Sequence, residues 1–115
     1  AYVKKERMST IEAIGFLKEE GAVPVIAHPL SVGFPDLREF LIEMKKMGLL
    51  GVESEYNYRP MKVAVSSEDV GKASLGLNLI QTGGSDYHGN QLMAKLGSVT
   101  VPTEIIEKIR KAADR

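Results

Sequence analysis

The 115 residues of the chain are enough for one hydrophobic core but not for two independent ones. Fifteen Lys and Arg residues balance fifteen Asp and Glu residues, which argues against a protein that coats nucleic acid but leaves a local anion site open. The absence of cysteine excludes disulfides, thiolate metal sites and a cysteine nucleophile. There is no bilayer-length apolar run and no signal-peptide core near Ala1, so we expect a cytoplasmic protein with no membrane partner.

The first part of the chain predicts a helix followed by a strand. Ser9 and Glu12 form a capping-box pattern, in which each side chain satisfies a free amide of the first turn, and Gly21 predicts the end of the helix. The residues expected on its inward face recur at helical spacing: Ile11, Ile14 and Leu17. The apolar run 23–27 predicts a buried strand, with Pro24 near its start because proline cannot donate a ladder hydrogen bond.

A second helix and strand follow. Asp36 has the pattern of a helix cap, and Gly48 predicts the end of that helix. Its apolar face is predicted to consist of Leu37, Phe40, Leu41, Met44 and Met47. The apolar run 49–52 then predicts a second strand, which leads into three polar residues at positions 53–55.

The second half of the chain predicts a helix over 60–75, a strand over 77–82 and a short fourth strand over 97–101. Thr103 is expected to cap a final helix, with Ile105, Ile106 and Ile109 turned inward. The strands are almost continuously apolar and are separated by helices. This arrangement predicts an α/β fold built from parallel βαβ units.

The polar residues that are suited to chemistry follow these strands directly. His28 follows the first strand, Glu53 and Glu55 end the second, and Asp86 and His88 follow the third. In parallel α/β folds the carboxyl ends of the strands share one edge, where reactive groups collect. We therefore expect these side chains at one edge of one sheet.

Imidazole and carboxylate groups are the mixed nitrogen and oxygen ligands of zinc, manganese and iron. Asp86 and His88 are two residues apart, so on an extended segment both can point toward one cluster. An ordinary strand-end histidine and an ordinary glycine-rich turn explain the same pattern, and spacing alone leaves both interpretations open. For Glu53 and Glu55 we favour solvent-exposed positions at the sheet edge. A G-x-S-x-G motif, a G-x-G-x-x-G motif and a P-loop lysine motif are all absent.

Two motifs together resemble a known family. The run Ala27-His28-Pro29 follows an apolar strand, and the run Gly84-Ser85-Asp86-Tyr87-His88-Gly89 comes much later. These runs are similar to the last two ligand motifs of the PHP (polymerase and histidinol phosphatase) family of metal-dependent phosphoesterases. The likeness is closest to the branch that hydrolyses 3′,5′-nucleoside bisphosphates or short oligonucleotides, and it extends over nearly the whole chain.

The resemblance implies a distorted (β/α)7 barrel that binds up to three divalent ions (Mn, Zn or Fe) and hydrolyses a phosphoester. It assigns His28, Asp86 and His88 as metal ligands, with Asp86 and His88 in catalytic roles. The substrate is expected to be a phosphorylated small molecule or short oligonucleotide, with Ser85 and Arg59 as the residues that bind it. Arg59 stands where this branch usually carries a histidine, and its guanidinium suits phosphate but not metal.

The other ligands of the family, including a His-x-His pair, belong to an N-terminal half that this sequence lacks. A βα barrel takes about 250 residues, so we expect residues 1–115 to be a single unit, about half of the barrel, at its C-terminal end. On this hypothesis the missing half is a necessary partner. The alternatives are a histidinol-phosphate phosphatase, a proofreading-type nuclease module, or a non-catalytic PHP-like binding module.

Overall fold

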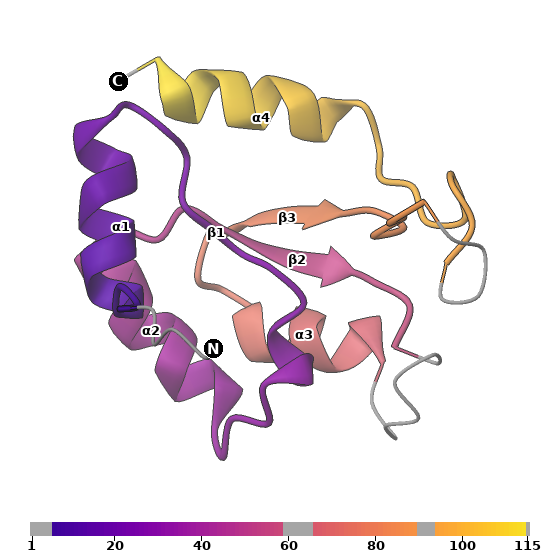
Figure 1. The fold of residues 1–115 in the computed structure, drawn as a ribbon, viewed down its shortest axis with the longest axis horizontal. Coiled ribbons are helices and arrows are strands. Elements are labelled where there is room, and N and C mark those ends of the chain that lie inside the picture. The colour runs from indigo at the N-terminus through magenta and orange to yellow at the C-terminus, as the bar shows by residue number, and fades with distance from the viewer. Residues whose placement is uncertain (1–5, 59–65, 90–93, 115) are drawn as a thin grey trace, which may run out of the picture.

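The computed structural model describes residues 6–58, 66–89 and 94–114 (Figure 1). Its elements are α1 (Thr10–Glu19), β1 (Val25–Ile26), the 3₁₀ helix η1 (Pro29–Ser31), α2 (Leu37–Met47), β2 (Gly51–Glu55), α3 (Ser67–Ser74), β3 (Ile80–Gly83) and α4 (Glu104–Ala113). Strands alternate with helices along the chain, which confirms the predicted α/β class.

The three strands form one parallel sheet in the order β1-β2-β3, so β2 is central and β1 and β3 are the edges. The predicted parallel βαβ units are therefore confirmed. The pairing of β2 with β3 shifts near its end, because Glu53 lies opposite Thr82 whereas Glu55 lies opposite Gly83. Ser54 is thus an extra residue in β2, which is a β-bulge next to the carboxyl edge of the sheet.

Local capping explains where the first two helices begin and end. The Oγ atom of Ser9 accepts a hydrogen bond of 3.2 Å from the N–H of Glu12, the Ser9 half of the predicted capping box. Oδ1 of Asp36 accepts one of 3.0 Å from the N–H of Glu39. Gly48 ends α2 with a φ of 115°, a conformation that glycine adopts without steric cost.

The hydrophobic core lies where α2 and α3 pack below the sheet in Figure 1, and α4 lies above the sheet, against β3. Leu41, Val52 and Val70 have no exposed surface. The buried residues of this core are Ile14, Leu37, Leu41, Met44, Leu49, Val52, Val70 and Leu79. Within the described ranges, no helix has both the length and the apolar character needed to cross a membrane.

Some predicted elements differ from the structure. The run 97–101 is not a strand, because Gly97 has a φ of 76° and the N–H of Ser98 closes a turn onto the carbonyl of Lys95 at 3.1 Å. Within the described residues, the predicted helix 60–75 is helical from Ser67 to Ser74, and positions 60–65 lie outside them. The third strand runs from Ile80 to Gly83, not over 77–82.

The predicted inward faces of the outer helices are only partly correct. On α1 Ile14 is buried, but Ile11 and Leu17 are exposed, because α1 packs against α2 and not against the sheet. On α2 Met47 is exposed. On α4 Ile105 is buried, whereas Ile106 is 50% exposed. These exposed apolar side chains have no cover within the part of the chain that the structure describes.

Candidate functional site

The carboxyl ends of the three strands lie at one edge of the sheet, as expected (Figure 1). The chain leaves β1 toward His28, leaves β2 toward Tyr56 and Tyr58, and leaves β3 toward Asp86 and His88. Contacts between these three exits join residues that lie 25 to 30 positions apart in the sequence, as described below. We call the following group of residues the edge site: His28, Ser31, Glu53, Tyr56, Tyr58, Asp86 and His88.

His28 occupies a turn with a positive φ of 24°, immediately before η1. Its backbone N–H donates a hydrogen bond of 2.7 Å to Oε2 of Glu53 on the neighbouring strand. The expectation of a solvent-exposed Glu53 is therefore wrong: the side chain is half-buried, because it satisfies the amide that β1 leaves free at its end. Glu55 is exposed, as expected.

The imidazole of His28 is held by Ser31, three residues later in the same 3₁₀ turn. Nδ1 of His28 lies 2.8 Å from Oγ of Ser31. The same hydroxyl donates to the carbonyl oxygen of His28 at 2.8 Å, and the N–H of Ser31 donates to that carbonyl at 3.0 Å. Three hydrogen bonds therefore connect these two residues.

Tyr56 links the first strand exit to the third. Its ring centroid lies 5.1 Å from that of the His28 imidazole, with the rings inclined at 48°. Its hydroxyl donates a hydrogen bond of 3.0 Å to Oδ2 of Asp86. Tyr58 packs edge-on against Tyr56 at 4.8 Å between centroids, and its hydroxyl accepts from the N–H of Leu30 at 3.4 Å. A tyrosine pair thus fills the space between the two predicted ligand motifs.

The environment of Tyr56 favours its neutral form. Burial raises its pKa from 10 to about 12, and the hydrogen bond to Asp86 and the negative charge of that carboxylate act in the same direction. Burial also raises the pKa of Tyr58. The carboxylate of Glu53 adds to both increases, so negative charge surrounds the tyrosine pair. A site with this electrostatic character attracts cations.

Asp86 and His88 are close to each other at the exit of β3. Asp86 has a positive φ of 55°, and Nδ1 of His88 donates to its backbone carbonyl at 2.6 Å. The same nitrogen lies 3.6 Å from Oδ1 of Asp86. The side chain of His88 is 72% exposed, so it is accessible from solution. Ser85 is half-buried beside Asp86, and Arg59 lies outside the described residues.

The donor types of the edge site suit a divalent transition metal, since they are imidazole nitrogens and carboxylate oxygens. In the ranges 6–58, 66–89 and 94–114, however, no three His, Asp or Glu side chains are grouped so that they alone could hold a metal ion. Within these ranges, the imidazole and carboxylate groups of the edge site therefore do not form a metal site by themselves.

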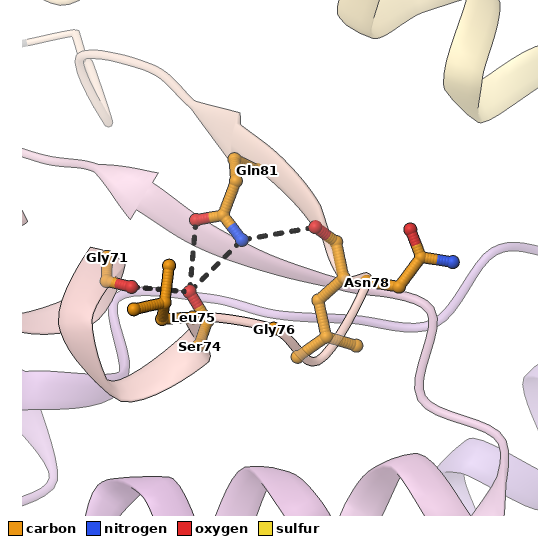
Figure 2. A pocket seen from close by; sticks show the side chains of 7 residues that line it. Gly71, Ser74, Leu75, Gly76, Asn78 and Gln81 are labelled. Atoms are coloured by element: carbon orange, nitrogen blue, oxygen red, sulfur yellow. Dashed lines mark hydrogen bonds between the residues drawn. The ribbon is translucent and has the colours of Figure 1, made fainter.

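A depression of about 320 Å³ lies at the other end of β3 (Figure 2). Two of its polar side chains bond to each other: Nε2 of Gln81 donates to Oγ of Ser74 and to the carbonyl of Leu79, both at 3.1 Å. Oγ of Ser74 also lies 3.2 Å from the carbonyl of Gly71. The side chains of Ser74 and Gln81 are thus engaged with each other and with the backbone.

Sequence reasoning missed three residues of the edge site: Ser31, Tyr56 and Tyr58. Tyr56 was not predicted, because its two partners are 28 and 30 positions away and only the folded sheet brings them together. Ser31 had a local signal: a serine three residues after His28, across a 3₁₀ turn that begins with Pro29. Glu53 was expected in solvent, but its carboxylate accepts a hydrogen bond from the amide of His28.

Comparisons with protein-family models, with curated proteins and with solved structures find no match for this chain. The edge site must therefore be interpreted from its own residues.

Proposed function

We propose that this chain contributes His28, Asp86 and His88 to a metal-dependent phosphoesterase site of the PHP type, which acts on a nucleotide-type substrate. The observation that carries the proposal is the position of Tyr56, which contacts the His28 ring on one side and the Asp86 carboxylate on the other. The two sequence motifs that resemble PHP ligand motifs are thereby joined at the carboxyl edge of one parallel sheet, where α/β enzymes carry their reactive groups.

Charge supports the same proposal. Glu53 and Asp86 place two carboxylates around the tyrosine pair, and Tyr56 stays protonated because its pKa is raised. A divalent ion bound there would supply positive charge for a phosphoester and activate water as the nucleophile. The chain's own residues bind the ion and hold its ligands: His88 is anchored on the Asp86 carbonyl, and Asp86 accepts the Tyr56 hydroxyl.

The remaining ligands are proposed to come from the other half of a (β/α)7 barrel. Two features support a covering partner of this kind. Among the described residues the edges of the sheet at β1 and β3 pair with no further strand, and apolar side chains are exposed on the outer helices. Ile11, Phe16 and Ile106 are each at least half exposed.

The second candidate function is a non-catalytic module of the same shape that binds a partner or a nucleotide. The absence of a three-donor cluster among the described residues favours it. The gene sequence upstream of Ala1 discriminates the two. A His-x-His pair on a strand would support the enzyme, and its absence would support the module.

The test measures bound metal and manganese-dependent phosphatase activity on this chain and on the full-length gene product. Suitable substrates are a 3′,5′-nucleoside bisphosphate, a short oligonucleotide and histidinol phosphate. We expect metal and activity in the full-length product only. Asp86→Asn should abolish both, whereas the matched change Asp114→Asn, at the exposed end of α4, should preserve them. Metal-free, inactive full-length protein would contradict the enzyme.

A further inference from the structure

We propose that Ser31 is a positioning residue that holds the imidazole of His28 in one orientation and in one tautomer, with the proton on Nδ1. The purpose of this arrangement rests on the proposed function. The evidence for it is the geometry of the turn between His28 and Ser31. Nε2 is then the nitrogen that carries the lone pair, and so the one able to bind a metal ion.

The tautomer follows from the number of hydrogens available. A carbonyl oxygen can only accept, and a hydroxyl has one hydrogen to donate. The Ser31 hydroxyl gives its hydrogen to the carbonyl of His28 at 2.8 Å. Its contact of 2.8 Å with Nδ1 of His28 can then be a hydrogen bond only if Nδ1 is the donor. The proton of the neutral ring is therefore on Nδ1.

The backbone fixes the hydroxyl in this position. His28 precedes the 3₁₀ helix η1, which begins with the rigid Pro29, and the N–H of Ser31 donates to the carbonyl of His28 at 3.0 Å. A second constraint on the His28 ring comes from Tyr56. The centroids of the two rings are 5.1 Å apart. The ring is therefore held through one nitrogen and by its contact with the Tyr56 ring.

His88 is held in the same tautomer by a different hydrogen-bond acceptor. Its Nδ1 lies 2.6 Å from the backbone carbonyl of Asp86, which can only accept, so this nitrogen also carries the proton. A backbone acceptor is not removed by a side-chain substitution. His88 is therefore an internal reference for any experiment on Ser31, and these are the two histidines of the chain.

The tautomer can be measured directly in the absence of metal. Long-range ¹⁵N–¹H correlation spectra of the histidine rings, recorded where both rings are neutral, distinguish a protonated Nδ1 from a protonated Nε2. The spectra of His28→Ala and His88→Ala assign the two rings. We expect both rings of the wild type to be protonated on Nδ1.

Substitution of Ser31 separates positioning from a structural role. In Ser31→Ala the His28 ring should redistribute toward the Nε2-protonated form, while His88 stays unchanged. Ser31→Thr keeps the hydroxyl and should retain the wild-type pattern. Val32→Ala, an exposed change at the end of the same turn, should also retain it. Circular dichroism verifies that each variant is folded. A His28 ring protonated on Nε2 in the wild type, or unaltered in Ser31→Ala, would overturn the inference.

Manganese binding to the full-length product then tests the purpose of this arrangement. Loss of the partner that orients a metal-binding histidine weakens binding by about 10-fold to 100-fold, so Ser31→Ala should fall in that range and Ser31→Thr should not. Unchanged affinity in Ser31→Ala would overturn a role for Ser31 in metal binding. A wild type that binds no manganese would instead contradict the proposed function, and the ring spectra would still decide the tautomer.

Discussion

The hydroxyl of Tyr56 donates a hydrogen bond of 3.0 Å to Oδ2 of Asp86, 30 positions further along the chain. Because the Tyr56 ring also lies against the His28 imidazole, this one side chain touches both motifs on which the functional proposal depends. The pair is largely shielded from solvent on the tyrosine side, where Tyr56 is 9% exposed. It is the contact whose removal has the most direct consequences for the edge site.

Tyr56→Phe removes this hydrogen bond while keeping the ring. A hydrogen bond to a charged group contributes about 1.5–3 kcal/mol, so the free energy of unfolding should fall toward the lower end of that range because Asp86 is partly exposed. Chemical denaturation measures the change. Tyr58→Phe is the matched control, since its bond to Leu30 is long at 3.4 Å and should contribute less. A larger loss in Tyr58→Phe than in Tyr56→Phe would contradict this ranking.

The raised pKa of Tyr56 predicts a loss of stability at high pH. The folded state holds the phenolic proton up to about pH 12, whereas the unfolded state releases it near 10. The folded state therefore binds more protons between these values, and its stability falls as the pH rises through this interval. The contribution is complete below pH 10 and amounts to about 3 kcal/mol at most. Denaturation curves measured across this interval should show a smaller pH dependence for Tyr56→Phe than for the wild type.

Gly83 and Gly84 should respond differently to the same substitution. A methyl group at Gly83 would lie 2.7 Å from the carbonyl oxygen of Glu55, whereas one at Gly84 would meet no atom within 4 Å. Gly83→Ala should lower the free energy of unfolding by about 1–3 kcal/mol through overpacking. Gly84→Ala should change it by about 0.5 kcal/mol or less. Equal effects in thermal denaturation would show that β2 and β3 are not this close.

Arg38 should stabilise the end of α3 from a neighbouring helix. Its Nη1 donates to the carbonyls of Ala73 and Leu75, at 3.2 and 2.7 Å, and Lys45 donates to the carbonyl of Leu77. These carbonyls lie in the last turn of α3 or just after it and would otherwise depend on water.

Arg38→Ala should therefore cost about 1–2 kcal/mol of unfolding free energy. Arg110→Ala removes only an exposed contact with Glu107 on α4 and should cost well below 1 kcal/mol. Hydrogen exchange provides the second measurement, because amides of α3 should lose protection selectively in Arg38→Ala. Uniform loss over the whole chain would contradict a local cap.

Local chemistry made much of the fold predictable. Ser9, Asp36 and Gly48 mark helix ends through contacts within a few residues, and the structure confirms each of them. The prediction of a fourth strand was wrong. The β-branched residues at 97–101 suit a strand, but Gly97 adopts a positive φ and the segment turns. The turn at Gly97 therefore outweighs the strand propensity of these residues.

The edge site was predictable only in outline. Parallel strands place His28 and Asp86 at the same edge, which the alternation of strands and helices predicts. The contacts through Tyr56 and Glu53 depend on the register between neighbouring strands, and the sequence pattern does not determine that register. Ser54, the extra residue in β2, is part of this register and had no recognisable signal.

The bulge at Ser54 means that the number of residues in this segment of β2 determines which way the later side chains point. Side chains alternate between the two faces of a strand, so removal of one residue turns every later side chain to the opposite face. Without Ser54, Tyr56 would take the exposed position of Glu55 and would lose both His28 and Asp86. Substitutions in this stretch alter single contacts, whereas a one-residue deletion would remove both contacts of Tyr56, to His28 and to Asp86, at once.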